Sequence, residues 1–480
     1  MQAWLRARQG QRRHGPPGNS AHAVESAAWG EALIHIIGAG LAGSEAAWQL
    51  ASRGHSVQIT EMRPQWTTPA HTTDRAAEMV CSNSFKSDDP NSATGILKAE
   101  MHRMDSLILR CAEATRVPAG NSLAVDRDLF SSAVTETLKN HPNIAWVEAQ
   151  VSVPNLRHPT ILATGPLTSD PLAEWLARIT GSGCLHFYDA IAPIVERDSI
   201  DMEIAWKASR YDKGGADFIN CPLDQLQYDA FLDALLSAER VPLHEVDTPY
   251  FEACLPIEVM ADRGRETLRH GPMKPVGLDN PRTGRWPHAI VQLRQDTLAG
   301  EHFNLVGFQT RLKWGAQKEV FRLIPGLAHA EFARFGSIHR NTYLQAPSLL
   351  DATLAVKPVP NLWVAGQLAG VEGYLESAAA GLAAAHFVDR ATRGEAPLPF
   401  PRDTVLGSLL HYLAHSSSKD FGPTNAMLGL LPAIPEDALD VRGLKRAGGL
   451  RAVKAAKGEV HRKRALTSLE RHLGSLGQVR

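Results

Sequence analysis

LIHIIGAGLAGSEAAWQLASRGHSVQITE, residues 33–61, is the stretch that decides the fold. The apolar run at 33–37 predicts a buried strand, and a glycine-rich turn at 38–43 leads into residues with the composition of a helix. A second strand is predicted at 56–60, and it ends at an acid, Glu61. A strand, a turn, a helix and a second strand in this order form a βαβ unit, so the sequence predicts an α/β protein with a parallel sheet.

The glycines of the turn meet the steric demands of a dinucleotide site. The first allows a tight turn, the second lets the backbone approach a pyrophosphate, and the third lets the helix pack against the strand. The N-terminus of the helix then faces the phosphates. An acid at the end of the second strand suits an unphosphorylated ribose 2′-hydroxyl, as in FAD or NAD. The predicted contacts are Gly38, Ala39, Gly40, Leu41, Ala42, Gly43, Glu61 and Arg63.

Two later segments favour FAD over NAD. An apolar strand at 160–163 runs into Thr164 and Gly165, and a strand near the C-terminal end runs into Gly366, before a helix of small residues at 377–385. Both look like the further glycine-bearing strand ends of flavoproteins, in which the last helix points its N-terminus at the flavin. The alternative is an ordinary strand followed by an alanine-rich helix.

The chain is long enough for more than one domain. It has 480 residues, 44% hydrophobic and 21% charged, which is typical of a globular enzyme. About 200 residues separate Gly165 from Gly366, more than a Rossmann-type sheet needs, so an inserted domain is expected. The predicted parts are a basic extension at 1–30, a Rossmann-like FAD-binding domain at 31–195 and 302–441, an inserted α/β domain at 196–301, and a basic tail at 442–480.

Positive charge is concentrated at the two ends of the chain. The net charge is −1, yet residues 1–30 contain four Arg against one Glu, and residues 442–480 contain eleven Lys or Arg against two Glu. Basic ends suit an anionic partner such as a nucleic acid, although a solvated tail has the same pattern. The first thirty residues lack the apolar core of a secretion signal, which leaves a transit peptide or a start-site extension.

The cysteines and the hydropathy of the sequence argue against a disulfide-rich protein, a structural metal site and a membrane protein. Five is an odd number, and no two cysteines have the close spacing of a zinc site, so neither a disulfide framework nor a structural metal is expected. We expect reduced thiols in a cytosol. The mean hydropathy is −0.19 and no apolar run reaches about 18 residues, so no membrane span is predicted.

Two cysteines lie in segments that are unlike a core strand. Cys254, in FEACLPIE, comes just before a basic stretch, and Cys81 begins the polar run CSNSFKS. Nearby cations favour the thiolate that a nucleophile requires, whereas most single cysteines are buried apolar residues. The basic stretch, 261–294, contacts RNA or an anionic ligand, or it is a surface with internal ion pairs. Its basic residues are Arg263, Arg265, Arg269, Lys274, Arg282, Arg285 and Arg294.

Eight ordered blocks resemble those of the folate- and flavin-dependent tRNA (uracil-5-)-methyltransferases, whose FAD domain is similar to that of larger flavoproteins that modify wobble uridines. The blocks cover roughly residues 33–440, and neither end of the chain has a matching motif. They are GAGLAGSEAA with TEMRP, CSNSFKSDDPNSATGILKAEM, VPAGNSLAVDRDLFS, ATGPLTS, CLPIEVMADRGRETLRHGPMKPVGL, FNLVGFQTRLKWGAQKEVFRLIPGL, HRNTYLQAP and VAGQLAGVEGYLESAAAGLAAA.

The resemblance implies a cytoplasmic enzyme with an FAD domain of the glutathione-reductase type, which methylates C5 of the T-loop uridine at position 54 of tRNA. Methylenetetrahydrofolate would provide the carbon, and NADH or NADPH would provide electrons through FAD. C5 of uracil becomes nucleophilic once a thiolate adds to C6. The resemblance gives that role to Cys254 and places Cys81 near the flavin.

Further site residues come from the same resemblance. It implies a flavin and folate cavity lined by Arg340, Asn341 and Thr342 with Gln309 and Arg311. It places Gly366, Gly370 and Glu372 near the isoalloxazine. It also makes Arg263, Arg265, Arg269 and Lys274 contacts to the folate tail or to tRNA.

Three other functions are weighed against this one. A wobble-uridine flavoprotein would have a longer chain, because fewer than 120 residues follow Gly366 here. A non-catalytic RNA-binding flavoprotein would keep its function without Cys254. A general NAD(P)H:flavin oxidoreductase would need neither the CLPIE nor the CSNS cysteine.

Overall fold

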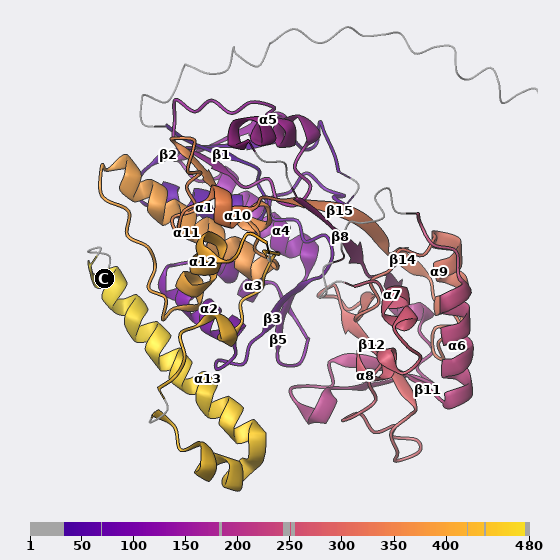
Figure 1. Cartoon of the computed structure of the whole chain (residues 1–480). Helices are drawn as coiled ribbons and strands as arrows, with labels where there is room; N and C mark the ends of the chain where they lie inside the picture. The colour runs from indigo at the N-terminus through magenta and orange to yellow at the C-terminus, as the bar shows by residue number, and fades with distance from the viewer. Residues whose placement is uncertain are drawn as a thin grey trace, which may run out of the picture.

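The computed structural model describes residues 33–68, 70–181, 185–242, 250, 255–419, 421–435 and 438–475. Cys254 and the extension at 1–30 therefore lie outside the described residues. The chain forms two lobes, and Figure 1 shows the first lobe, with α1, α11 and α12, to the left of the second, with α6, α9 and β11. In the part of the chain that the structure describes, no helix is long and apolar enough to span a membrane.

A parallel sheet forms the centre of the first lobe. Its strand order is β16-β7-β1-β2-β6, and every pairing in it is parallel. The strands are β1 (Leu33–Ile37), β2 (Ser56–Glu61), β6 (Ile144–Glu148), β7 (Thr160–Leu162) and β16 (Leu362–Val364). The βαβ unit and both later strands were predicted from the sequence, and the α/β fold class is confirmed.

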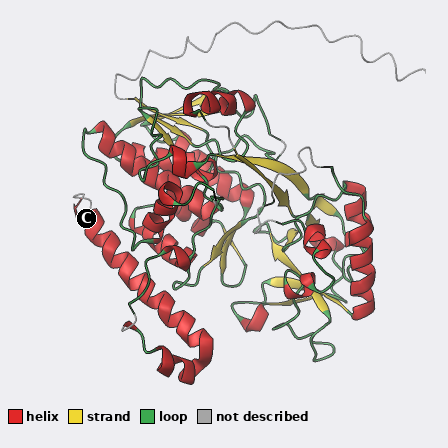
Figure 2. Cartoon of the chain, in the orientation of Figure 1, coloured by secondary structure: helices red, strands yellow, loops and turns green. Residues whose placement is uncertain are grey.

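Helices cover this sheet on its two faces (Figure 2). The closest pair is α1 (Leu41–Ser52) and α11 (Tyr374–Thr392), where a Cβ at Gly381 would lie 2.0 Å from the carbonyl oxygen of Ala42. Only glycine permits such a close approach. The other helices of the lobe are α2 (Ala93–Arg103), α3 (Leu107–Ala114), α4 (Arg127–Lys139), α5 (Asp170–Thr180), α10 (Ala346–Leu349) and α12 (Val405–His415).

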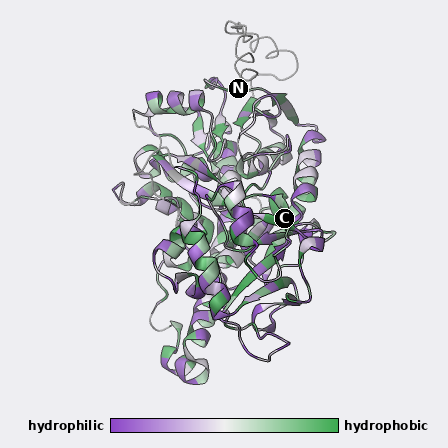
Figure 3. Ribbon diagram, turned by 90° about the vertical axis from the view of Figure 1, so that its right-hand side faces the viewer, coloured by the Kyte–Doolittle hydropathy of each residue, from purple (hydrophilic) through white to green (hydrophobic). Residues whose placement is uncertain are grey.

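The second lobe is built on an antiparallel sheet of order β10-β11-β12-β13-β9-β14. Its strands are β9 (Ile194–Glu196), β10 (Trp206–Ala208), β11 (Phe218–Leu223), β12 (Ala289–Gln295), β13 (His302–Leu305) and β14 (Phe332–Arg334). Four helices accompany them: α6 (Gln225–Ser237), α7 (Ile257–Asp262), α8 (Thr267–His270) and α9 (Trp314–Phe321). In Figure 3 the inner segments of the molecule are largely green and the outer loops largely purple, as expected for packed cores.

The predicted boundaries of the inserted domain, 196–301, are wrong at their C-terminal end. A boundary at 301 separates β12 from β13, although these strands pair with each other, and it excludes β14 from the sheet. The buried core of this lobe continues to Ala330. We propose instead that the inserted domain spans about residues 194–334.

Two smaller strand groups lie between the lobes. The antiparallel ribbon of β8 (Leu185–Ile191) and β15 (Ser337–Tyr343) contains both crossings of the chain between the lobes. A three-stranded sheet, β3-β5-β4, lies below the parallel sheet (Figure 1). Its strands are β3 (Ser84–Ser87), β4 (Arg116–Val117) and β5 (Ser122–Val125).

The basic tail predicted at 442–480 is a packed helix over most of its length. Helix α13 (Val441–Ser475) lies along the first lobe, with Ala465 and Leu469 buried. Arg464 forms an ion pair with Asp403, and Arg103 of α2 pairs with Glu470. The segment is therefore part of the fold, apart from residues 476–480, which are outside the described residues.

Candidate functional site

A cleft with about 1010 Å³ of space opens at the carboxyl ends of β1, β2, β7 and β16. This edge of a parallel sheet is where α/β proteins bind ligands. Predicted cofactor residues from four separate segments line the cleft together. They are Gly38, Gly40, Leu41, Ala42, Glu61, Arg63, Thr164, Gly165 and Gly366. We call this space the first cleft.

The glycines of the first turn differ in what surrounds them. Gly38 has φ +98°, and a Cβ there would lie 2.6 Å from the carbonyl oxygen of Ala163. A Cβ at Gly43 would lie 1.9 Å from the carbonyl oxygen of Gly38, so strand and helix touch at this point. A Cβ at Gly40 would come no closer than 3.8 Å to its nearest neighbour, the carbonyl oxygen of Ala163, and Gly40 lines the cleft. Backbone can therefore meet a ligand at Gly40, as a pyrophosphate site requires.

Glu61 joins the glycine turn to the second strand. Its side chain accepts the N–H of Ala39 at 2.8 Å, so Ala39 acts through Glu61 rather than by lining the cleft. Arg63 donates through Nε to the other carboxylate oxygen at 2.8 Å. Burial alone would raise the pKa of Glu61, but hydrogen bonds and the charge of Arg63 outweigh it and lower that pKa. Glu61 is thus an anion at the end of β2, where a ribose acid is expected.

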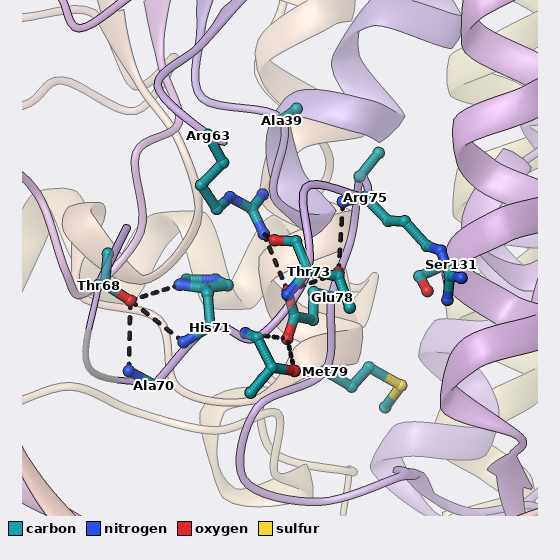
Figure 4. Close-up of polar contacts among 12 residues, drawn as sticks. Ala39, Arg63, Thr68, Ala70, His71, Thr73, Arg75, Glu78, Met79 and Ser131 are labelled. Carbon is teal, nitrogen blue, oxygen red and sulfur yellow. Dashed lines mark hydrogen bonds and ion pairs between the residues drawn. The ribbon is translucent and has the colours of Figure 1, made fainter. Parts of the chain in front are cut away.

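A polar loop after β2 fixes Arg63 in place. Arg63 also donates to Glu78 at 3.1 Å, and Figure 4 shows this pair beside His71. Glu78 accepts four further hydrogen bonds from the backbone and hydroxyl groups of Thr72 and Thr73. Burial, with the charge of Arg63, lowers the pKa of His71 to about 4, so this imidazole is neutral at pH 7. The sequence analysis missed His71 and Glu78, both of which line the cleft.

The far end of the first cleft is formed by Gly366 and the start of α11. Gly366 has φ +74°, and a Cβ there would lie 2.9 Å from Cβ of Ala42. Gly370 and Glu372 are buried behind the cleft wall that Gly366 and Tyr374 form. A Cβ at Gly370 would lie 2.5 Å from the ring of Phe421. Burial raises the pKa of Glu372 well above its usual value, and Gln367 donates to its carboxylate at 2.6 Å. These two residues support the wall and do not line the cleft.

Cys81 is hydrogen-bonded to Tyr374, the first residue of α11, which lines the first cleft. The N–H groups of Cys81 and Ser82 lie 2.8 and 3.2 Å from the phenol oxygen of Tyr374, which accepts both. A phenol has two acceptor lone pairs and one proton, so that proton is left for the sulfur of Cys81 at 3.0 Å. Tyr374 itself lines the cleft. The geometry therefore makes Tyr374 a hydrogen-bond donor to the Cys81 sulfur.

The cysteine is held as a neutral thiol. Burial, with the negative charge of Asp189, raises its pKa to about 12, although the hydrogen bond from Tyr374 opposes this rise. Two half-buried cations from different lobes lie nearby. Arg127 pairs with Asp296 at 3.1 Å and donates to the carbonyl oxygen of Met79, and Arg294 donates to the hydroxyl of Ser82 at 3.0 Å. The Cys81 loop is thus fastened to β12 of the second lobe.

A wider second cleft, with about 1770 Å³ of space, continues from the first. The two share a wall made of Met62, Gln150, Pro166, Leu167, Thr168 and Ser169. The aromatic residues Trp66 and Tyr188 line the second cleft, as does the predicted Thr342, whose N–H donates to the carbonyl oxygen of Pro166 at 2.8 Å. Aromatic walls and open space suit a planar ligand larger than a nicotinamide.

The predicted run 340–342 lies on β15, but its members face different surroundings. Arg340 is opposite Tyr188 in the register of the β8–β15 ribbon. Asn341 is fully buried, and its amide donates to Asp189 at 3.4 Å while its Oδ1 has no partner among the described residues. Thr342 lines the second cleft, and Asn341 does not.

The segment that follows Cys254 is tied to another predicted pair. Ile257 donates its N–H to the carbonyl oxygen of Gln309 at 2.7 Å. Glu258 accepts the N–H of Arg311 at 2.8 Å and the hydroxyl of Thr310 at 2.9 Å. Gln309 and Arg311 thus fix the start of α7 through their backbone groups.

Two arginines of the basic stretch pair with acids of their own lobe. Arg265 contacts Asp229 at 2.8 Å and Asp233 at 2.6 Å, both on α6. Arg269 pairs with Glu266. These two arginines therefore match the ion-paired surface that the sequence left open as an alternative, whereas Arg294 points into the site.

Tyr374, Arg127 and Arg294 were not identified as site residues from the sequence. Tyr374 and Arg127 lie inside two of the quoted blocks, and Arg294 belongs to the basic stretch. Among the described residues, no group of three or more potential ligands is arranged to hold a metal ion.

Comparisons with known proteins agree with this geometry. A family model described as glucose inhibited division protein A matches residues 33–396. A curated relative from Solibacter usitatus, named methylenetetrahydrofolate--tRNA-(uracil-5-)-methyltransferase TrmFO, is 53% identical over 444 residues, which cover 92% of this chain and 98% of the relative. One of the same name from Sphingopyxis alaskensis is 55% identical over 414 residues, covering 84% of this chain and 92% of the relative.

Solved structures show the same fold at much lower identity. Aquifex aeolicus GidA in one crystal form is 16% identical with a TM-score of 0.61, covering 93% of this chain and 77% of that one. At this identity the likeness concerns the fold alone. The identity to the curated relatives over almost their whole length confirms the resemblance, and the chain belongs to the family of TrmFO-type methylenetetrahydrofolate–tRNA-(uracil-5-)-methyltransferases within the GidA-related flavoproteins.

Proposed function

We propose that this protein methylates C5 of a uridine in tRNA, with FAD as cofactor, methylenetetrahydrofolate as carbon donor and NADH or NADPH as reductant. Relatives 53% and 55% identical are named for the folate-dependent reaction on tRNA. The target within tRNA is the T-loop uridine at position 54, and the product is 5-methyluridine. The protein acts in the cytosol, where the thiols of Cys81, Cys111 and Cys221 stay reduced.

One observation supports this function most strongly: a dinucleotide cradle, a cysteine and an aromatic-walled chamber adjoin one another. The first cleft runs from Gly40 and Glu61 to Tyr374, which touches Cys81. The second cleft shares its wall at residues 166–169 and offers separate space for a second planar ligand. The transfer of a methylene group from folate, followed by its reduction to a methyl group, requires a flavin site, a reactive cysteine and a folate site next to one another.

The residues of the first cleft fit FAD. Gly40 has room for a close ligand, the N-terminus of α1 presents unpaired N–H groups, and the anionic Glu61 can accept a ribose hydroxyl. Gly366 and Tyr374 would hold the flavin end. When bound and reduced by NADH or NADPH, FAD would supply the two electrons that convert a methylene group into a methyl group.

The chain's own residues would prepare the sulfur chemistry. Tyr374 donates a hydrogen bond to the Cys81 sulfur. This bond lowers the pKa of Cys81 and so favours its thiolate, although burial has the larger, opposite effect. Arg127 and Arg294 place positive charge near the same loop. Cys254, through its thiolate, would add to C6 of the uracil and make C5 nucleophilic.

The function is tested with purified protein, an unmodified tRNA transcript, NADH and methylenetetrahydrofolate labelled in its methylene carbon. Nucleoside analysis should find label in 5-methyluridine, and a transcript with cytidine at position 54 should take up none. Cys254→Ala and Cys81→Ala should bind FAD and tRNA but lose methylation. Cys111→Ala, which changes a buried thiol away from the clefts, is the matched control and should keep it.

Each other result points to a different function. Label in a wobble uridine would indicate the wobble-uridine enzymes. A yellow protein that oxidises NADH without labelling tRNA would indicate a general oxidoreductase. Full methylation by Cys254→Ala would exclude that cysteine as the nucleophile.

A further inference from the structure

One face of helix α13 is buried in the C-terminal part of the helix and exposed in its N-terminal part. Residues 458, 465 and 472 are seven positions apart and share a face of the helix, because seven residues make nearly two turns. Gly458, Ala465 and His472 are all buried against the first lobe. The preceding position on this face is Arg451, which is exposed. His461, also buried, is preceded by the exposed Lys454 in the same way.

The face changes where the helix passes the edge of the lobe. A Cβ at Gly458 would lie 2.3 Å from the carbonyl oxygen of Asn91, so this glycine marks the closest approach to the loop before α2. N-terminal to it, the helix continues past the lobe as far as Gly448 and Gly449, where the backbone leaves helical geometry. Figure 1 shows this end of α13 below the strands β3 and β5. We call residues 445–457 the α13 overhang.

The overhang is strongly basic and its cations are available to a partner. Its charged residues are Lys445, Arg446, Arg451, Lys454 and Lys457, all exposed, with no acid among residues 445–457. None of the five forms an ion pair with a residue in the described part of the chain. Further along the helix the pattern is different, because Lys463 pairs with Glu459 and Arg464 with Asp403.

We propose that the α13 overhang binds the phosphate backbone of the substrate tRNA, away from the uridine that reacts. This inference rests on the proposed function, since it names the same substrate. Arg451, Lys454 and Lys457 follow at intervals of three residues, so they form a row about 9 Å long. Such a row of long cationic side chains matches a run of phosphates.

Two other occupants fit the overhang less well. A membrane surface requires an apolar face beside the basic one, and Leu450 is the one large exposed apolar side chain of the overhang. A second copy of this chain would have to supply acids in a matching row. Phosphate needs neither feature.

A contact of this kind acts on binding rather than on chemistry. The overhang belongs to the outer end of α13, and none of its residues lines either cleft. Loss of its charges should therefore raise KM for tRNA and leave kcat unchanged. Each lost phosphate contact should also reduce the salt dependence of binding by about 0.9 in the slope of log K against log salt.

The test compares two charge-matched double variants of full-length, FAD-loaded protein. Arg451→Gln/Lys454→Gln removes two charges from the overhang, and Lys463→Gln/Arg471→Gln removes two exposed charges from the packed part of the same helix. Affinity for an unmodified tRNA transcript is measured by fluorescence anisotropy at several salt concentrations, together with kcat and KM for methylation. Flavin absorbance and the unfolding temperature show that both variants are folded.

The inference predicts about tenfold weaker tRNA binding for the overhang variant, a salt slope lower by about two, and an unchanged kcat. The control variant should bind like the unaltered protein. Equal weakening in both variants, or none in the overhang variant, would overturn the inference while leaving the proposed function intact. Unaltered protein that neither binds nor methylates tRNA would overturn both. A change of oligomeric state confined to the overhang variant would assign the surface to a second copy instead.

Discussion

The two main sheets contribute to the site in different ways. The parallel sheet places glycines and Glu61 at the ends of its strands, so its part of the site is made largely by the backbone. The antiparallel sheet contributes side chains from the end of β12: Arg294 donates to Ser82 of the Cys81 loop, and Asp296 pairs with Arg127 at the start of α4. The first kind of contribution depends on steric fit, and the second on buried charge.

This difference explains why the density of positive charge in the sequence did not identify the site residues of the second lobe. Its sequence is rich in Lys and Arg, yet Arg265 and Arg269 are paired with acids of the same lobe. Arg294 lies in the same stretch, is half-buried and donates to Ser82 at the site. Position in the sheet, rather than charge density, separates the arginine that serves the site from those that do not.

The largest effect is expected from Gly43→Ala, which attacks the steric contribution. The new Cβ would lie 1.9 Å from the carbonyl oxygen of Gly38, so strand and helix must separate. We expect a loss of about 3 kcal/mol in the free energy of unfolding, with release of FAD. Urea unfolding and flavin absorbance measure both.

Gly54→Ala is the control for that change. Gly54, unlike Gly43, has a positive φ, +88°, and nothing lies within 4 Å of its Cβ position. It should cost about 1 kcal/mol from backbone strain alone and leave FAD bound. Equal losses for the two variants would show that the close contact at Gly43 is unimportant.

Tyr374→Phe removes the hydrogen bond to the Cys81 sulfur. Hydrogen bonds to charged groups contribute about 1.5–3 kcal/mol, so methylation should slow by roughly ten- to a hundredfold, with FAD still bound. The pKa of the thiol should rise further, because the bond from Tyr374 lowers it. The alkylation rate of Cys81 against pH reports this shift. An unchanged pH profile would rule out the proton donation.

Two arginines of the second lobe give a direct test of buried against surface charge. Arg294→Gln removes a half-buried cation that donates to Ser82, and methylation should slow about tenfold. Arg265→Gln breaks exposed ion pairs with Asp229 and Asp233 and should change kcat and KM for folate by roughly twofold or less. A larger loss of methylation in Arg265→Gln than in Arg294→Gln would contradict the assignment of Arg294 to the site.

Glu61→Gln should produce the smallest change in stability, about 1 kcal/mol, and it should depend on pH. The folded-state pKa of Glu61 lies below its usual 4.5. The carboxylate therefore stabilises the fold above about pH 4.5, and this stabilisation is lost as the pH falls through the lowered pKa. Urea midpoints of the two proteins should differ at pH 7 and converge on acidification. A constant difference would show that the charge of Glu61 is not responsible.

The parallel sheet and its cradle could be predicted from the sequence because each part is local. A run such as 33–43 contains its own strand, turn and helix start, and the strand at 160–162 leads directly into Gly165. The boundary at 301 could not be predicted, because β12 and β13 are identified only by their pairing. Antiparallel pairing across a short connection has no signal in either strand alone.

The side-chain part of the site was missed for a related reason. Tyr374 and Cys81 are 293 positions apart, and only the packing of α11 beside the Cys81 loop brings them together. The loop around His71 and Glu78 was also missed, since its hydrogen bonds form within an irregular segment without periodicity. Cys254 was singled out by its place before the basic stretch, and its role as the nucleophile comes from the resemblance.

The raised pKa of Cys81 has a consequence for the life of the protein in the cell. Burial raises the pKa of this thiol to about 12, so the thiolate is strongly disfavoured at pH 7. Peroxides and electrophilic metabolites react with thiolates rather than with thiols. In the resting protein this sulfur should therefore react with oxidants more slowly than a cysteine of ordinary pKa.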